Sequence, residues 1–358
     1  MKKSKIIILL ILIFCIAGGI WYYWKWGEDL RFAKKLGAGI NIGNSLDATG
    51  LRNYNPNASE LDYETFWNDE PITRQMLRTI AAAGFQTVRI PITWEDHLDA
   101  EGMIAEEWMN RVETVVQYAL DEGLYVIINL HHEMWLDLKA GKEEEISRLF
   151  QTVWMQVAER FASYEEHLIF ESMNEPRLRD SIHEWDEGTA ELRDMVNHLN
   201  RIFVDTVRGS RGKNKKRYLM ISPYASNHEE KALQDLEIPG SHIIVSVHTY
   251  IPYDFCQNEE GTKEWNKEDA ESRQKILTVL ENIDRYFLQR GVPVSFTEFG
   301  CKNKDNLKAR KEWTDFFVKE AKKHGIPYVW WDDGGDYALL DRSKNNWIWP
   351  ELVEILTK

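Results

Sequence analysis

Short apolar runs alternate with amphipathic stretches from position 37 to the end of the chain. Eight of these runs are nearly continuous and rich in β-branched residues, which is typical of strands that are buried on both faces of a parallel sheet. They predict strands at Gly37–Ile42, Thr87–Ile92, Tyr125–Leu130, Leu168–Met173, Tyr218–Ser222, Ile243–Val247, Val292–Phe296 and Tyr328–Trp331.

The stretches between the runs predict helices, because their apolar residues recur three or four positions apart. Clear examples cover 146–161 and 192–207, and a third covers 276–287, which is followed by the stop signals Gly291 and Pro293. Eight strand–helix alternations fit a (β/α)8 barrel, which typically takes roughly 250 residues and tolerates insertions. We therefore predict a single (β/α)8 TIM barrel of the α/β class, with a doubly wound sheet as the alternative.

The start of the chain has a different character. A lysine-rich beginning precedes an unbroken apolar run over 6–24, which ends in four aromatic residues. That run nearly reaches the roughly 20 residues that span a bilayer, whereas a cleaved signal peptide has an apolar core of about 7–15. We predict a signal peptide or N-terminal membrane anchor over 1–26, a barrel domain over 27–358, and an extracellular or cell-surface location. Cleavage and retention of the leader both stay open.

Composition narrows the range of partners. The chain has 58 acidic and 44 basic residues, a formal charge of -14, and its 43% hydrophobic content is ordinary for a globular protein. Without the four lysines of residues 1–26, 40 basic residues face 58 acidic ones, which gives -18. Such an acidic domain suits a neutral substrate better than nucleic acid. Its 15 tryptophans exceed what core filling usually requires and fit a surface that grips sugars.

Polar residues gather at the C-terminal ends of the predicted strands, where the loops of a barrel share one mouth. They are Arg89 and Trp94 in or after the second strand, His131, His132 and Glu133 after the third, Asn174 and Glu175 after the fourth, His248 and Tyr250 after the sixth, Glu298 after the seventh, and Trp331 and Asp332 at the end of the eighth.

Two glutamates on well-separated strands can face each other across such a mouth, as glycoside hydrolysis requires. One carboxylic acid protonates the departing glycosidic oxygen, and the other, ionised, attacks the anomeric carbon or activates water. An arginine such as Arg89 beside one carboxylate keeps it charged, and that charge raises the pKa of the other. The pair Glu175 and Glu298 is therefore the leading candidate for the chemistry.

Six segments carry a resemblance to a known family: GNSLDA at Gly43–Ala48, VRIPI at Val88–Ile92, NLHHE at Asn129–Glu133, LIFESMNEP at Leu168–Pro176, VHTY at Val247–Tyr250 and FTEFG at Phe296–Gly300. In this order the chain resembles glycoside hydrolase family 5, the retaining cellulase family, and most of all its subfamily 4 of endoglucanases and xyloglucanases. The resemblance covers about residues 35 to 335 and implies a (β/α)8 fold.

The resemblance also implies residue roles. Glu175 is expected to be the general acid/base and Glu298 the nucleophile. The other expected catalytic residues are Asn174, which hydrogen-bonds the sugar 2-hydroxyl, Tyr250 and Arg89, which orient Glu298 and hold it ionised, and His131 and His248, which brace the pair. Trp331 is expected to stack beneath the sugar next to the cleavage point, with Trp330 as the alternative, and Asn44, His132 and Trp135 are weaker candidates for substrate binding.

The expected function is that of a retaining endo-acting glycoside hydrolase on β-1,4-glucan type polysaccharides such as cellulose, mixed-linkage β-glucan or xyloglucan. Xylanase or mannanase activity at the same site is one alternative, and a catalytically silent surface glycan-binding barrel is another. No cofactor is expected, the protein is expected to be a monomer, and pairing of Cys256 with Cys301 stays open.

Two other readings are disfavoured. A metal site at His131, His132 and Glu133 is unexpected, because adjacent residues on a strand point to opposite sides. A dinucleotide loop at Gly37, Gly39 and Gly43 lacks its third glycine, since Ile42 occupies that place.

Overall fold

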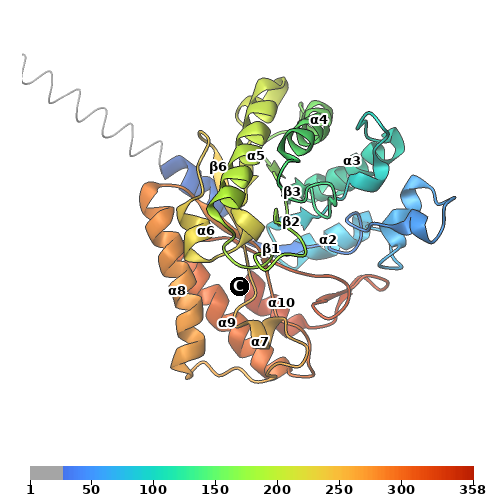
Figure 1. The fold of residues 1–358 in the computed structure, drawn as a ribbon. Helices are drawn as coiled ribbons and strands as arrows, with labels where there is room; N and C mark the ends of the chain where they lie inside the picture. The colour runs from blue at the N-terminus through green and yellow to red at the C-terminus, as the bar shows by residue number, and fades with distance from the viewer. Residues whose placement is uncertain (1–26) are drawn as a thin grey trace, which may run out of the picture.

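The structure is a computed structural model that describes residues 27–358, so the predicted leader over 1–26 lies outside the described residues. Eight parallel strands pair in sequence order, and β8 pairs with β1, which closes a barrel. Helices pack around these strands (Figure 1). The predicted (β/α)8 barrel is confirmed, and the doubly wound alternative is wrong. Across residues 27–358, no helix combines the length and the apolar character needed to cross a membrane.

The barrel strands are β1 Ala38–Asn41, β2 Thr87–Ile90, β3 Tyr125–Asn129, β4 Leu168–Glu171, β5 Leu219–Ile221, β6 Ile243–Thr249, β7 Val294–Phe299 and β8 Tyr328–Trp330. All eight predicted strands are present, with shifted ends. The largest shift is in β7, which begins after Pro293, a residue without an N–H to donate to a neighbouring strand. Strands β6 and β7 also end later than predicted, so His248 and Glu298 lie within these strands rather than after them.

From residue 74 onward the helices are α2 Arg74–Ala82, α3 Glu106–Asp121, α4 Glu143–Arg160, α5 Ala190–Gly209, α6 Glu230–Gln234, α7 Tyr253–Cys256, α8 Ala270–Tyr286, α9 Leu307–His324 and α10 Pro350–Thr357. The three helices predicted from their apolar stripes correspond to α4, α5 and α8. Their stripes face the strands, and in α5 the side chains of Val196, Leu199 and Phe203 are buried. Thr189 caps the start of α5 by accepting a hydrogen bond from the Leu192 N–H.

Shorter elements lie in the loops. They are the 3-10 turns η1 Leu51–Asn53, η2 Glu60–Thr65, η3 Glu95–His97, η4 Gly212–Lys215, η5 Tyr224–Ser226 and η6 Leu288–Arg290, and a two-stranded sheet of β9 Leu340–Asp341 and β10 Asn346–Trp347. The sheet of β9 and β10 was not predicted, because strands of two residues leave no periodic pattern in a sequence.

The two ends of the barrel differ. Residues 27–36 form a helix, and Phe32 from it stacks on Tyr218 with ring centroids 3.5 Å apart. The Tyr218 hydroxyl donates to Asp29 at 2.9 Å. Phe32, Tyr218 and Tyr125 belong to a buried cluster that is separate from the main core. The helix therefore closes this end of the barrel, and the polar site lies at the other end.

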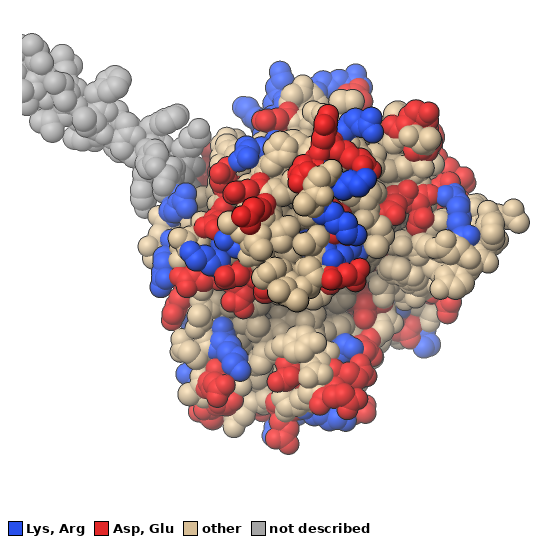
Figure 2. All heavy atoms as spheres, in the orientation of Figure 1, with Lys and Arg blue, Asp and Glu red and all other residues tan. Residues whose placement is uncertain are grey.

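Charged side chains of both signs are interspersed on the face shown in Figure 2, and uncharged side chains line the hollow across its middle. Cys256 and Cys301 are buried and free in the structure.

Candidate active site

The two glutamates predicted to work together meet at the mouth of the barrel. Glu298 lies in β7, and Glu175 follows β4. A carboxylate oxygen of each and a ring nitrogen of His248 all lie within 4.8 Å of one another. The Glu298 side chain is 6% exposed and that of Glu175 is 19% exposed. Both carboxyl groups are therefore largely buried, and Glu175 is the more exposed of the two.

Arg89 is the centre of the hydrogen-bond network beneath this pair. It is fully buried on β2, and its guanidinium donates to Glu298 Oε1 and Glu171 Oε2, each at 2.7 Å. It also donates to Asn174 Oδ1 at 2.8 Å and to Asn41 Oδ1 at 2.9 Å. Burial alone would lower the pKa of Arg89, but the two carboxylates outweigh it and raise that pKa. The Arg89 guanidinium thus fixes the side chains of both Glu298 and Asn174, the residue that precedes Glu175.

Tyr250 and His248 contact the carboxyl pair from β6 and the loop after it. The Tyr250 hydroxyl donates to Glu298 Oε2 at 2.9 Å. Burial raises the pKa of this hydroxyl well above its ordinary value, so it stays protonated and remains a donor. His248 Nδ1 lies 2.9 Å from Glu175 Oε1 and 3.5 Å from Glu298 Oε2. The imidazole therefore bridges the two carboxyl groups.

The charges around the pair act differently on its two members. Burial raises the pKa of Glu298, and the charge of Glu175 adds to this, although His248 and Arg89 oppose it. Burial acts in the same direction on Glu175, but the hydrogen bond and charge of His248, together with Arg177, outweigh it and lower the pKa of Glu175. In the free protein this order is the reverse of the one predicted, because the sequence did not reveal how close His248 and Arg177 come to Glu175.

His131 and Trp331 form one wall of the mouth. Burial lowers the pKa of His131 well below its ordinary value, so the ring is neutral. It lies parallel to the half-buried Trp331 ring, with centroids 5.8 Å apart and planes within 4°. Trp330 is 0% exposed and its indole N–H donates to the Tyr337 carbonyl, so it lies inside the protein. Of the two tryptophans, Trp331 is the one that a sugar can reach.

The three weaker candidates lie around the rim. His132 is partly exposed, and its ring meets Trp67 edge-on at 5.5 Å. Trp135 is half-buried, and its indole N–H donates to Glu133 at 2.9 Å. Asn44 adopts a φ of 56° and donates from its side chain to the backbone carbonyl of residue 333. Each residue has an anchored side chain near the mouth, but none contacts the glutamate pair in a recorded hydrogen bond.

A metal site at His131 and His132 was disfavoured because adjacent strand residues point to opposite sides, and this argument is wrong. Strand β3 ends at Asn129, so His131 and His132 follow it, and their ring centroids lie only 4.4 Å apart. A carboxylate oxygen of Asp47 and one nitrogen of each ring lie within 4.8 Å of one another. Burial raises the pKa of Asp47 to about 6. Backbone N–H groups of residues 44 and 45 already hold this carboxylate, at 3.0 and 2.7 Å.

Sequence reasoning missed several residues that support the site. Glu171 is fully buried at the end of β4, where it accepts from Arg89, from Asn129 at 3.0 Å and from Ser246 at 2.5 Å. Asn41 donates to backbone carbonyls of β7 and β8 while it accepts from Arg89. The sequence signal for Glu171 is an acidic residue inside an apolar strand, which indicates a cationic partner because a buried carboxylate needs one.

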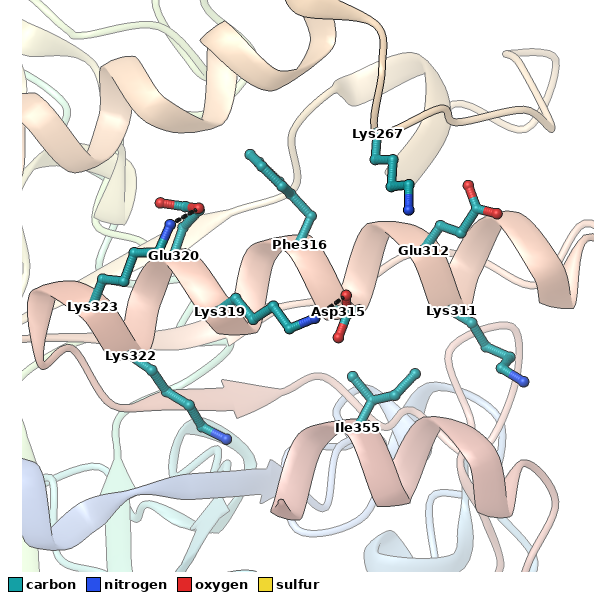
Figure 3. A pocket seen from close by; sticks show the side chains of 10 residues that line it. All are labelled: Lys267, Lys311, Glu312, Asp315, Phe316, Lys319, Glu320, Lys322, Lys323 and Ile355. Carbon is teal, nitrogen blue, oxygen red and sulfur yellow. Dashed lines mark hydrogen bonds and ion pairs between the residues drawn. The ribbon is translucent and has the colours of Figure 1, made fainter.

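A separate hollow lies on the outside of the barrel. It has a volume of about 720 Å³ and is lined by side chains of α9 together with Lys267 and Ile355 (Figure 3). Two of its acidic groups are paired with lysines of the same helix, Asp315 with Lys319 and Glu320 with Lys323. Pairs one turn apart along one helix are typical of a helix surface. The chemistry of the barrel mouth does not extend to it.

The site and the fold agree with a comparison against known families. The model of the family described as cellulase (glycosyl hydrolase family 5) matches residues 51–336. The chain belongs to glycosyl hydrolase family 5. The family resemblance seen in the six sequence segments is therefore confirmed.

Endoglucanases are among the named relatives of this family 5 chain. Endoglucanase B of Ruminococcus albus is 38% identical over 335 residues, which cover 90% of this chain and 79% of the relative. Endoglucanase A of Clostridium longisporum is 37% identical over 337 residues, and the match spans 92% of this chain but only 65% of that relative's length. A solved structure described as a GH5-4 broad specificity endoglucanase from Ruminococcus champanellensis with bound cellotriose superposes with a TM-score of 0.88 at 36% identity, and covers 92% of this chain and 98% of that one. The resemblance to subfamily 4 is confirmed.

Proposed function

We propose that this protein is a retaining, endo-acting glycoside hydrolase that cleaves β-1,4-glucan type polysaccharides with Glu175 and Glu298. The observation that carries the proposal is the approach of the two carboxyl groups, since one oxygen of Glu175 lies within 4.8 Å of one oxygen of Glu298. Retaining enzymes hold their carboxyl groups about 5–5.5 Å apart, whereas inverting ones need about 6.5–9.5 Å to admit a water. The family membership and the endoglucanase relatives support the same reaction class.

The reaction has two steps. In the first, Glu298 attacks the anomeric carbon, the bond from that carbon to the glycosidic oxygen breaks, and Glu175 gives its proton to the departing oxygen. In the second, Glu175 takes a proton from water while the water oxygen attacks the same carbon and releases Glu298. Asn174 is proposed to hydrogen-bond the sugar 2-hydroxyl, and its hydrogen bond from Arg89 at 2.8 Å supports this by fixing the side chain.

The first step requires a proton on Glu175, although the free protein favours ionisation there. A sugar that fills the mouth removes water from Glu175, which is the more exposed carboxyl, and desolvation raises the pKa of an acid. The Glu298 side chain is already almost fully buried, and it keeps its hydrogen-bond donors Arg89 and Tyr250 when substrate binds. Substrate binding therefore moves the proton preference toward Glu175.

The proposed substrates are cellulose derivatives, mixed-linkage β-glucan and xyloglucan. Support comes from the half-buried Trp331 face, which suits the C–H groups of a glucosyl ring, and from the solved structure of a broad specificity endoglucanase that holds cellotriose. Xylan lacks the hydroxymethyl group of glucan, and mannan differs from glucan in the configuration at C2. A reducing-sugar assay on purified polysaccharides of each kind will rank the substrates, and activity on xylan or mannan alone would overturn the glucan assignment.

The test of the mechanism uses Glu175→Gln and Glu298→Gln, with Glu107→Gln at the exposed start of α3 as the matched control. Each of the first two variants should lose at least about a thousandfold in kcat on soluble β-glucan, because one half of the pair is removed. Proton NMR of the earliest product should show retention of the anomeric configuration. A wild type that binds glucan without cleaving it would favour the silent glycan-binding alternative, and early inversion would refute the two-step mechanism.

The proposal includes a secreted or surface-anchored location, supported by the apolar run over 6–24. Cell fractionation tests it with an antibody against the barrel domain. Full-length protein in the membrane fraction supports an anchor, and a shortened protein in the medium supports a cleaved signal. Protein found only in the cytosol would refute this part of the proposal.

A further inference from the structure

The two buried cysteines lie on neighbouring backbone segments beside the candidate active site. Cys256 ends α7, in the loop that follows β6, and Cys301 lies two positions after the end of β7. The N–H of Lys302 donates to the Cys256 carbonyl at 3.0 Å, which keeps the Cα atoms of the two cysteines within about 8 Å of each other. Disulfides join Cα atoms roughly 4.4–6.8 Å apart. The backbone contact therefore brings the pair in or near the range of a disulfide.

Other contacts already hold the same two segments together. The buried Lys304 Nζ donates to the backbone carbonyls of residues 254 and 258, at 2.8 and 2.6 Å. The Lys302 side chain donates to Glu259 at 3.0 Å. These contacts join the loop over 253–262 to the segment over 301–304. A covalent bond at this place would link segments that the fold itself brings together, so it would need little change in the backbone.

One fully buried arginine lies beside Cys301. Arg310 is on α9, and none of its three side-chain nitrogens has an oxygen acceptor among residues 27–358. Burial raises the pKa of Cys301 to about 11, but the charge and hydrogen bond of Arg310, together with a hydrogen bond of Thr314, act against this rise. Burial also raises the pKa of Cys256 well above its usual value, and there the charge of Cys301 adds to the effect. Arg310 therefore favours a thiolate on Cys301 over one on Cys256.

We propose that Cys256 and Cys301 form a reversible disulfide that locks the loop after β6 to the segment after β7. The oxidant is a small disulfide such as oxidised glutathione, which reaches the thiols when this surface loop opens. The Cys301 thiolate attacks one glutathione sulfur and releases a glutathione thiolate. Cys256 then gives up its proton, attacks the Cys301 sulfur and releases the second glutathione thiolate. The protein loses two electrons and two protons, and one glutathione disulfide becomes two thiols.

The bond has consequences for stability near the site. The cysteines are 45 positions apart (301 minus 256), and closing a loop of this size restricts the unfolded chain. For a domain of this size, Tm should rise by about 5 °C on oxidation. Strand β6 carries His248 and β7 carries Glu298, so the lock joins the two chain segments that leave these strands. The oxidised protein should therefore also keep its activity longer during heating. The proposed location outside the cell is one where such bonds form and persist.

The experiment incubates the full chain with oxidised glutathione, both in its folded form and during refolding from urea, where access to the thiols does not limit the reaction. Trypsin should then release fragments 232–263 and 291–302 as one linked species, two hydrogens lighter than their sum, which dithiothreitol separates. Cys256→Ser should instead carry one glutathione on Cys301, and Cys301→Ser should leave Cys256 unmodified in the folded protein. Cys15→Ser is the matched control and should form the same linked species.

The outcomes separate this proposal from the proposed function. Free thiols at both positions after refolding with oxidised glutathione, detected by alkylation, would overturn the disulfide, and a linked species with the Tm of the reduced chain would overturn the lock. Glutathione on Cys256 in Cys301→Ser, with none on Cys301 in Cys256→Ser, would overturn the role of Arg310. A chain that forms the link but cleaves no β-glucan would refute the proposed function alone. Circular dichroism identifies a misfolded serine variant, and the wild type reduced with dithiothreitol then supplies the comparison of Tm.

Discussion

The hydrogen bond from Tyr250 to Glu298 offers the sharpest test of the proposed nucleophile. Tyr250→Phe removes one hydroxyl and keeps the ring, so the carboxylate loses a donor at 2.9 Å while the packing stays. A hydrogen bond to a charged group contributes about 1.5–3 kcal/mol. Since each pKa unit corresponds to about 1.36 kcal/mol, the pKa of Glu298 should rise by roughly one to two units.

The direction of the change in activity follows from the role of the residue. Glu298 attacks only when ionised, and the lost donor favoured its ionised form, so the acidic limb of the kcat/KM profile should move to higher pH by about one to two units. The assay uses 2,4-dinitrophenyl β-cellobioside, because its leaving group needs no proton and the profile then reports the nucleophile. At the optimum the rate should fall about tenfold or more, through the lost orientation of the carboxylate.

Tyr337→Phe is the matched control for this variant. Its ring lies 5.8 Å from that of Tyr250, but its hydroxyl donates to the backbone carbonyl of residue 256 rather than to a carboxylate. The acidic limb should therefore stay in place in this control. A limb that does not move in Tyr250→Phe, or that moves equally in both variants, would refute the assignment of Tyr250 as the partner of an ionised Glu298.

Three further predictions concern stability and cofactors. Burial raises the pKa of Glu133 from 4.5 to about 8, so its contribution to stability is complete below the unfolded pKa and is lost as the pH rises through 8. Glu133→Gln should therefore flatten the dependence of the unfolding free energy on pH between about pH 5 and 8, and an unchanged slope would contradict this. Arg89→Met leaves Glu171 and Glu298 buried without their cation and should cost about 3–5 kcal/mol in urea unfolding at pH 7, a loss that Glu171→Gln in the same chain should reduce. Extensive dialysis against EDTA should leave β-glucan hydrolysis unchanged. A loss that one metal ion restores would contradict the metal-free mechanism and would make the clusters around Asp47 and Glu175 the sites to examine.

The sequence predicted most of what lies on the strands. Buried parallel strands need continuous apolar runs, and the mouth of a barrel collects polar residues at their C-terminal ends, so Glu175 and Glu298 could be paired before any coordinates were known. Strand ends were less accurate, because Glu298 lies inside β7 and not after it. The structure decides between Trp330 and Trp331 as the candidate sugar-stacking residue, because Trp330 is buried and Trp331 is accessible.

What the sequence did not predict depends on distances across the barrel. The importance of Glu171 follows only from its contact with Arg89, a residue of a different strand. The lowered pKa of Glu175 follows from His248 at 2.9 Å, and no spacing along the chain gives that distance.

The helix over residues 27–36 determines which end of the barrel lies next to the point where the chain enters the domain. It packs against Tyr218 and Tyr125, at the end of the strands away from the two glutamates. The chain thus enters the domain at its closed end. Any tether joined there, whether natural or engineered for immobilisation, would leave the open end facing outward, where long insoluble fibres can approach without passing the point of attachment.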